Sequence, residues 1–410
     1  MAQTAKKLPR KKYAMFFILI GAVCSAVGAL LVFSEYGGLP LYSKKVYDLP
    51  WYILIVGVLV LFYGIYQRTA NRRLGEEVSF SGGSAKSFFL KYALIFALLV
   101  LVIVVICIEP AFLKLDVMFD ILAQSSIKLI IALGICFTLL IAGTDLSAGR
   151  MVGLAAVISA SMLQKPTYAS RFFPNLPQVP VILPILLAVL ACMCFGTLNG
   201  FLVAKFGMHP FIATLATQVI IYGACSLYFD MPPNNSQPIG GVRQDFQDLA
   251  QFKLFGRISI LVPIALGVTL IIWFVLNKTV FGKNVYAIGG NTEAAVVSGV
   301  NVFRTIMGIF ILASALSGFG GVLEAARTAG ATNNYGTGYE LDAIAACSVG
   351  GVSLAGGVGK VSGIVVGVLI FTVIQYGLQF IGVSPMWQQI IKGIIIAVAV
   401  AIDLSKYHKK

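Results

Sequence analysis

The sequence predicts an all-α integral membrane protein. Of its 410 residues, 59% are hydrophobic and only 11% are charged, whereas a soluble domain carries about 25% charged residues. Apolar stretches of about 20 residues, the length that crosses a bilayer as a helix, recur along the chain. The net charge of +14 does not indicate a nucleic-acid partner, because the basic residues lie between apolar stretches, where they set the orientation of membrane helices.

Two early spans are expected at about residues 15–33 and 51–66, and a polar linker follows at 67–87. We therefore divide the chain into an N-terminal extension, 1–85, and a core, 86–410. The expected core spans are at about 88–108, 119–142, 148–164, 181–204, 210–229, 258–277, 305–325, 341–358, 360–381 and 387–403.

The 341–358 stretch is short and rich in glycine. This composition favours a broken or re-entrant segment, whose backbone must be buried in protein or face water.

The distribution of Lys and Arg predicts the orientation. With the N-terminus inside, the segments assigned to the inside carry 19 of the 30 basic residues and those assigned to the outside carry 9. This bias places both termini in the cytoplasm. The first apolar run, 13–33, exceeds the 7–15 residues typical of a secretory signal core, so we interpret it as a retained signal anchor.

Metal and disulfide sites are not expected. The seven cysteines lie mostly inside apolar runs, and the chain has only two histidines. No pair of cysteines with partner histidines has the spacing of a metal site. We therefore predict no metal and no cofactor bound by this chain.

The longest polar interruption between two apolar runs is residues 288–302, with the sequence IGGNTEAAVVSGVNV. The glycines break the preceding structure, Asn291 is a suitable N-cap, and Glu293 favours the positive end of a helix dipole. A helix of under two turns is predicted, and Ser298 with Gly299 ends it. An ordinary inter-helix loop is the alternative. The residues of the proposed segment are Gly289, Gly290, Asn291, Glu293, Ala294, Ala295, Ser298 and Gly299.

Three motifs carry a family resemblance. FGKNVYAIGGNTEAAVVSGVNV at 281–302 resembles the cytoplasmic coupling segment of ABC sugar-import permeases of the ribose, xylose and galactose group. GTDLSAGR at 143–150, and ATNNYG with YELDAIAAC at 331–347, resemble the galactose/methyl-galactoside branch. The resemblance covers about residues 88–410. It implies a ten-span core like that of cobalamin importers, with residues 1–85 as two additional helices.

The resemblance also implies a function. The chain would be the permease subunit of an ATP-driven importer of galactose or methyl galactoside, with glucose as a further candidate. It would work as a homodimer in the bacterial cytoplasmic membrane. Its partners would be an ATPase with two fused nucleotide-binding modules, which binds ATP and Mg, and an extracytoplasmic galactose/glucose-binding protein. In such permeases the segment at 289–299 docks into a groove of the ATPase.

Two alternatives belong to other classes. An ion-coupled secondary transporter would need titratable residues within its spans, and only Lys128 and Lys392 are expected to lie that deep. A membrane enzyme would need clustered Asp, His or Arg residues on a cytoplasmic loop, and no such cluster is found. The GVSLAGGVGKVS sequence at 351–362 also fails the phosphate-loop pattern, because Leu354 stands at the first glycine position and Val361 follows Lys360. We therefore expect a non-catalytic subunit.

Polar residues in two regions are candidates for the sugar path or its gate. Around 143–150, Asp145 or Ser147 could instead cap the next helix, with Arg150 at the lipid headgroups. In the 333–342 region, the alternative is a solvated outer loop, and Glu324 could pair with Arg327. The path candidates are Thr144, Asp145, Ser147, Arg150, Asn199, Asn333, Asn334, Tyr335, Glu340 and Asp342.

Other features are interpreted as structural. Lys128 and Lys392 are expected to snorkel to the interface. Glycines spaced by four residues, at 149 and 153, at 196 and 200, and at 359, 363 and 367, predict close helix approach. The turns at 206–210 and 381–385 indicate an inverted repeat.

Overall fold

The computed structural model describes residues 22–23, 25–26, 29 and 102–407. The expected spans at 15–33 and 51–66, and most of the one at 88–108, lie outside these residues. The chain divides into two compact units, Met1–Met118 and Phe119–Lys410. All the sites described below lie in the second unit.

The described part is mostly helical, with one small hairpin of two strands. Its elements are η1 (Pro110–Leu113), α4 (Leu115–Leu140), α5 (Ala148–Met162), α6 (Ile182–Phe206), α7 (Pro210–Asp230), α8 (Gln244–Gln251), β1 (Lys253–Leu254), β2 (Ile258–Ser259), α9 (Leu261–Lys278), α10 (Val280–Gly290), α11 (Thr292–Val297), α12 (Val302–Thr328), α13 (Tyr339–Val349), α14 (Val361–Phe380) and α15 (Pro385–Tyr407). Among the described residues, six helices are long and apolar enough to cross a membrane: α4, α6, α7, α9, α12 and α14.

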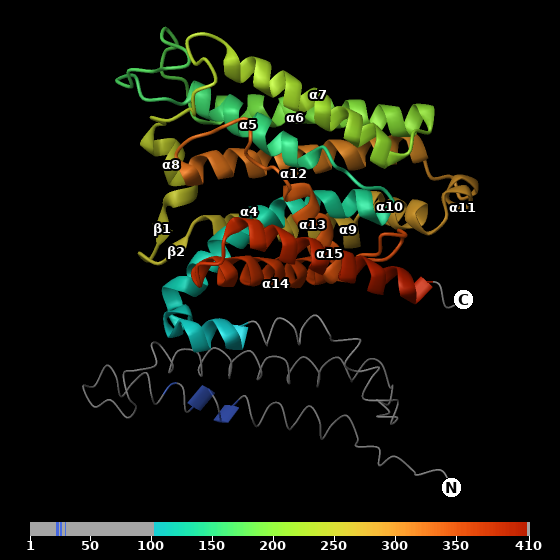
Figure 1. Ribbon diagram of the computed structural model, residues 1–410. Coiled ribbons are helices and arrows are strands. Elements are labelled where there is room, and N and C mark those ends of the chain that lie inside the picture. Colours follow the sequence, from blue (N-terminus) through green and yellow to red (C-terminus); the bar gives the residue numbers. More distant parts are fainter. Residues whose placement is uncertain (1–21, 24, 27–28, 30–101, 408–410) are drawn as a thin grey trace. The chain divides into compact units, whose positions relative to one another are not determined.

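Helix α12 lies in the middle of the second unit, where it packs against α5, α6 and α8 (Figure 1). Small residues allow the close contacts. A Cβ added to Gly196 of α6 would lie 2.6 Å from the Phe310 carbonyl oxygen, and one added to Gly321 would lie 2.3 Å from that of Val152. Close approach of the helices gives van der Waals contact between them. This contact stabilises their association, because lipid provides no hydrophobic driving force for it. The glycines at 149, 153, 196, 363 and 367 all meet backbone atoms of other segments, which confirms the predicted packing role.

Two of the expected spans form helices that are too short to cross a bilayer. Helix α5 has 15 residues and α13 has 11, so at 1.5 Å per residue they extend about 22 Å and about 16 Å, against a hydrocarbon core of about 30 Å. The segment expected to span at 341–358 is therefore broken, as its glycines indicated. Its helix ends at Val349, and a turn with left-handed glycines at 351, 356 and 357 leads to α14.

The N-terminal ends of these two short helices meet. The chain pairs Ala331 with Ile239 and then runs alongside α5. A Cβ on Gly149 would lie 2.5 Å from the Gly336 carbonyl oxygen, so no larger side chain fits between these backbones. Residues 333–338 thus pack along α5 and are not the free outer loop that the sequence suggested as an alternative.

The elements outside the spans gather at two ends of the second unit (Figure 1). We call one the α11 end; it holds α10, α11 and the C-terminal end of α15. The other, the α8 end, holds α8 and the β1–β2 hairpin. This separation matches the predicted topology, in which 278–304 and 404–410 share one side and 230–257 lie on the other. Both turns of the suggested repeat contain a left-handed glycine, Gly207 and Gly382, and the repeat itself remains a prediction.

Candidate functional site

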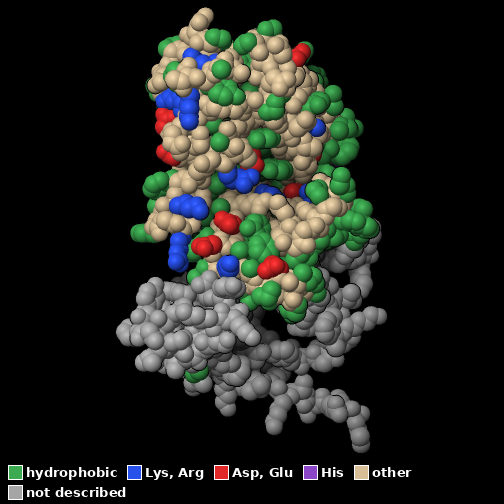
Figure 2. Space-filling model, turned by 60° about the vertical axis from the view of Figure 1, so that its left-hand side comes forward, with side chains coloured by type: hydrophobic (Ala, Val, Ile, Leu, Met, Phe, Trp, Pro, Cys, Tyr) green, Lys and Arg blue, Asp and Glu red, His purple; other side chains and the backbone are tan. Residues whose placement is uncertain are grey.

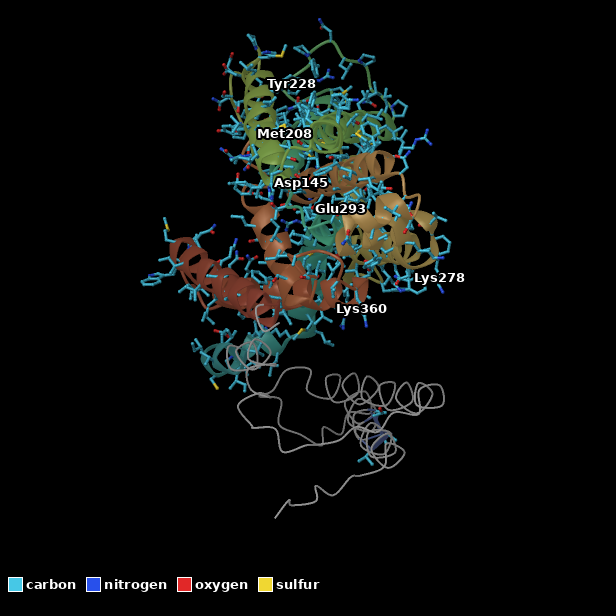
Figure 3. All side chains as sticks on the ribbon, turned by 90° about the vertical axis from the view of Figure 1, so that its right-hand side faces the viewer. Asp145, Met208, Tyr228, Lys278, Glu293 and Lys360 are labelled. Atoms are coloured by element: carbon cyan, nitrogen blue, oxygen red, sulfur yellow. The ribbon has the colours of Figure 1, made fainter. Side chains whose placement is uncertain are left out.

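Helix α11 has the local structure that its sequence predicts. The Asn291 side chain accepts a hydrogen bond from the Ala294 backbone N–H at 2.9 Å, and Glu293 lies in the first turn. The helix ends at Val297, and Gly299 follows with φ of +83°. Only Ala295 is buried, while Val297 is 89% exposed. Most of the surface of this six-residue helix is therefore exposed, at the end of the second unit that faces the viewer in Figure 3.

The segment before α11 differs from the prediction. Gly289 and Gly290 do not break the chain there; they are the last residues of a separate helix, α10, which Thr279 caps. The spacing of Phe281, Val285 and Ile288 is helical and is the signal that could have revealed it.

Helix α10 is attached closely to the rest of the bundle. A Cβ on Gly289 would lie 1.8 Å from the Leu140 carbonyl oxygen and 2.7 Å from the Gly357 nitrogen. The same Leu140 oxygen accepts a hydrogen bond from the Gly357 N–H at 2.8 Å. We call the backbone contact of Leu140, Gly289 and Gly357 the glycine joint. It connects α10 to the end of α4 and to the turn between α13 and α14.

A second contact strengthens this connection. The Tyr286 hydroxyl donates a hydrogen bond to the Gly359 carbonyl at 2.9 Å. Burial raises the pKa of the Tyr286 hydroxyl above its ordinary value, so the group stays a donor at physiological pH. At its other side, α11 leads directly to α12, whose N-cap is Asn301. Helix α11 is therefore connected to two parts of the bundle: directly to α12, and to the end of α4 through α10 and the glycine joint.

The first interior group lies at the N-terminus of α5. Asp145 and Asn199 are fully buried (Asp145 is labelled in Figure 3). One Asp145 oxygen accepts hydrogen bonds from the Ser147 backbone N–H at 2.9 Å and the Ser147 hydroxyl at 2.6 Å, and the Asn199 amide donates to that hydroxyl at 2.9 Å. Asp145 thus holds Ser147, the N-cap residue of α5, whose own side chain makes no capping hydrogen bond to the helix. Its second oxygen and the Asn199 carbonyl oxygen have no hydrogen-bond partner.

Arg150 is held by protein groups rather than placed at the headgroups. Its guanidinium lies 4.3 Å from the centre of the Tyr222 ring and donates to the Thr337 hydroxyl at 3.1 Å. The Thr214 hydroxyl of α7 donates to the Thr144 carbonyl at 3.1 Å. Sequence reasoning missed Thr214, Tyr222 and Thr337, because no local pattern shows that α7 and the 333–338 segment flank α5.

The 333–342 candidates lie on both sides of the start of α13. The Asn333 amide donates to the Ser226 hydroxyl at 3.1 Å, whereas Asn334 is exposed. Tyr335 is half-buried next to Gly153 of α5. Glu340 is buried beside Gly149, in the first turn of α13. The structure thus brings Glu340 to the α5 N-terminus, whereas Asp342 lies in a separate ionic cluster, which is described next.

Asp342 is the centre of a buried ionic cluster. Its carboxylate lies 2.8 Å from Lys392 Nζ and 3.8 Å from Lys128 Nζ, and it accepts a hydrogen bond from the Gln375 amide at 3.1 Å. Lys128 also donates to the Gln375 side-chain oxygen. The expectation that both lysines snorkel is therefore wrong: they point to a carboxylate inside the bundle, which offsets the cost of placing charge there.

The predicted Glu324–Arg327 pair is present at 2.8 Å, and the Tyr339 hydroxyl lies 3.4 Å from Glu324. The ends of α12 and α13 are thus connected through polar groups. Within the described residues, no group of three His, Cys, Asp or Glu side chains is placed to hold a metal ion.

Comparisons with known proteins place these features in a family. The family described as branched-chain amino acid transport system / permease component matches residues 117–400. No solved structure matches the chain significantly.

Curated relatives match most of the chain. The galactose/methyl galactoside import permease protein of Haemophilus influenzae is 52% identical over 334 residues, which are 79% of this chain and 98% of the relative. That of Escherichia coli K12 is 50% identical, over 76% of this chain and 94% of the relative. The ribose import permease protein of Bacillus subtilis is 37% identical, over 75% of this chain and 91% of the relative. The chain therefore belongs to this family of transport-system permease components, as an ABC permease subunit.

Proposed function

We propose that this chain is the membrane-spanning, non-catalytic subunit of an ATP-driven importer of galactose or methyl galactosides. The observation that carries the proposal is the 52% identity to a galactose/methyl galactoside import permease over 98% of that relative's length. The lower identity to a ribose permease, 37%, favours the hexose. The subunit works as a homodimer with a cytoplasmic ATPase of two fused nucleotide-binding modules and an extracytoplasmic binding protein.

The topology proposed with this function places the α11 end and both termini in the cytoplasm of a bacterium, with the α8 end outside the inner membrane. The core has ten membrane segments, of which α5 and α13 are too short to cross the bilayer, and residues 1–85 are an additional extension. About a fifth of this chain lies outside the alignment with the Haemophilus relative, which supports such an extension.

In this mechanism, ATP binding closes the partner ATPase around α11. The glycine joint transmits the movement to α4 and to the turn that follows α13, while Asn301 transmits it to α12. Because α13 and α5 are short helices that meet at Gly149 and Gly336, a shift of α13 changes the polar surface around Asp145 and Glu340. That surface is the proposed path, and its hydroxyl, amide and carboxylate groups suit a sugar.

The sequence disfavours an ion-coupled secondary transporter because only two titratable residues, Lys128 and Lys392, are expected deep within the spans. The structure buries three carboxylates, those of Asp145, Glu324 and Asp342, so titratable groups are available inside the bundle. The family assignment is therefore what favours an ATP-driven importer over an ion-coupled transporter. Sugar uptake in proteoliposomes that contain the permease, ATPase and binding protein distinguishes an ATP-driven importer from an ion-coupled transporter. Uptake should require ATP inside the vesicles and should survive proton and sodium ionophores. Uptake driven by an ion gradient without ATP would refute the proposal.

Glu293→Arg is expected to uncouple ATP hydrolysis from transport. The change puts a positive charge on the exposed first turn of α11, where the helix dipole disfavours it and where the ATPase docks. Asp248→Arg, an equal charge reversal on exposed α8, is the control. Sugar-stimulated ATPase activity should fall strongly for Glu293→Arg alone, with the permease still inserted in the membrane. Equal activity of the two variants would remove Glu293 from the coupling surface.

Asp145→Asn tests the path. The substitution keeps an oxygen that can accept from Ser147 but removes the charge and the unpartnered carboxylate oxygen. Since each lost hydrogen bond is worth about 0.5–1.5 kcal/mol, initial uptake should fall by about two- to tenfold. Asn334→Ala should cause a loss within the same range.

The control for both is Asp230→Asn, whose carboxylate is exposed and bonded only to Ser236 among the described residues. Uptake is normalised to assembled complex. Unchanged uptake in both path variants would leave Asp145 as a structural residue at the start of α5 and Asn334 as a surface residue.

A further inference from the structure

The β1–β2 hairpin at the α8 end exposes two aromatic rings. Its strands pair Lys253 with Ser259 and Leu254 with Ile258, and a turn of three residues joins them. Phe255 begins that turn and is 94% exposed, more than any other large hydrophobic residue described, and Phe252 is 55% exposed. Such exposure has no role in the packing of this chain.

The backbone at Phe255 adds to this observation. Its φ is +52°, in the left-handed region, and Gly256 follows at +71°. Glycine or asparagine adopts this conformation with less strain than a bulky residue. The conformation of the turn therefore does not itself favour a phenylalanine at this position.

The hairpin is held firmly to the bundle. The Ser259 hydroxyl donates to the Ala250 carbonyl of α8 at 3.0 Å, and the Ile260 N–H donates to the Phe252 carbonyl at 2.9 Å. Gln251 donates to the Arg327 carbonyl, at the end of α12, at 3.0 Å. The exposed rings thus have a fixed position relative to the spans.

That position lies at the edge of the lipid-facing surface. Helix α9 begins at Leu261, directly after the hairpin, and buries only Leu261, Ala265, Ile272 and Leu276. Five of its large apolar residues, Leu266, Leu270, Ile271, Trp273 and Phe274, are exposed, while Ile264, Val268 and Val275 are partly buried. An apolar span with so narrow a buried stripe faces hydrocarbon over most of its surface. The hairpin continues this surface at the level where the span ends (Figure 1).

The chemistry of the hairpin fits a lipid headgroup region. Lys253 and Arg257 are exposed beside the two rings, and residues 252–260 contain no acidic side chain. Figure 2, which turns the α8 end forward, shows Lys and Arg next to hydrophobic side chains along an edge of this face. Exposed Phe side chains bury at the boundary between headgroups and acyl chains, and basic side chains there are attracted to anionic lipids.

We propose that the β1–β2 hairpin is a membrane-interface anchor for anionic phospholipid. Phe252 and Phe255 insert among the headgroups at the outer end of α9, while Lys253 and Arg257 bind the lipid phosphates. The anchor fixes the depth and tilt of α9, which leads to α10 and α11. It concerns the lipid contact of the permease and does not depend on which solute is carried.

The test introduces a tryptophan at the tip of the hairpin. Full-length Phe255→Trp protein is reconstituted in phosphatidylcholine and phosphatidylglycerol vesicles, with and without bromine on the acyl chains near the headgroup. The emission of the wild type, which contains Trp51, Trp273 and Trp387, is subtracted. Val297→Trp on α11 is the matched control, because Val297 is 89% exposed at the opposite end, beyond the spans.

Bromolipid should quench most of the emission added by Phe255→Trp, and aqueous acrylamide should quench little of it. The reverse is expected for Val297→Trp. Quenching of the Phe255→Trp signal by acrylamide alone would overturn the proposal. Protection from acrylamide only when the sugar-binding protein is added would also overturn it, since the hairpin would then be a protein-docking surface.

A second arm tests the charges. Adding Lys253→Gln and Arg257→Gln to Phe255→Trp should reduce bromolipid quenching in phosphatidylglycerol vesicles to the level seen in pure phosphatidylcholine. If the variant without Lys253 and Arg257 is quenched in phosphatidylglycerol vesicles as strongly as Phe255→Trp alone, the binding of anionic phosphate is refuted. Neither arm measures transport, so each can fail or succeed independently of the proposed import function.

Discussion

Replacing Asp342 with Asn is expected to destabilise the protein severely and to abolish transport. One carboxylate is shared by two ammonium groups, Lys392 at 2.8 Å and Lys128 at 3.8 Å. These lysine side chains are only 17% and 14% exposed. Removing one partner of a buried ion pair costs about 3–5 kcal/mol, because the remaining charge is uncompensated. Here two cations would be left without their carboxylate.

The cluster contains two positive charges and one negative charge, so variants that remove a lysine can be compared with the variant that removes the carboxylate. Lys392→Met leaves Lys128 and Asp342 as a one-to-one pair, so its loss should be much smaller than that of Asp342→Asn. Adding Lys128→Met and Lys392→Met to Asp342→Asn should recover part of the stability, since no charge then remains in this cluster. Thermal unfolding in detergent and sugar uptake measure the effects. A melting temperature for Asp342→Asn equal to that of Lys392→Met would contradict the role of Asp342 as shared counter-ion.

The consequence for transport follows from the elements that the cluster connects. Asp342 lies on α13, Lys128 on α4, Gln375 on α14 and Lys392 on α15. Helix α13 has only 11 residues, so it has less surface in contact with neighbouring helices than a full span has. The cluster fixes its position, and with it the place where Glu340 meets the α5 N-terminus.

Features that depend on neighbouring residues were predictable from the sequence. The Asn291 cap, the acidic first turn at Glu293 and the stop at Gly299 follow from rules that act over three or four residues. The broken segment after α12 also follows, since its glycines disfavour a continuous span. Most span positions follow from apolar runs of bilayer length.

Features that depend on the packing of distant segments were not predictable in this way. Lys128 and Asp342 are more than two hundred positions apart in the sequence. Considered alone, each charged side chain would be unfavourable inside the membrane. The lysines were therefore incorrectly predicted to snorkel to the interface. Helix α10 was missed because Gly289 was interpreted as a helix breaker. Gly289 instead lies within a helix, where the lack of a side chain allows α10 to pack closely against the Leu140 carbonyl. This contact is visible only in the three-dimensional structure.

Gly289→Ala is expected to disconnect α11 from the spans while leaving both helices formed. The added Cβ would lie 1.8 Å from the Leu140 carbonyl oxygen and 2.7 Å from the Gly357 nitrogen. Both are backbone atoms, so no side chain can rotate away, and the glycine joint must open. Overpacking in a tight core costs about 1–3 kcal/mol, and alanine itself favours helix over glycine by about 1 kcal/mol, so a local opening is expected rather than loss of α10.

The control is the neighbouring residue. Gly290→Ala adds the same methyl group at a position with no atom within 4 Å of it, so it should retain wild-type behaviour. In the complete reconstituted complex, Gly289→Ala should keep basal ATP hydrolysis but lose its stimulation by sugar and binding protein, and uptake should fall by at least about tenfold if the joint opens at a cost above about 1.4 kcal/mol. If both glycine variants transport equally well, then force does not pass from α10 to α4 through the glycine joint, and the direct connection from α11 to α12 at Asn301 must carry the whole movement.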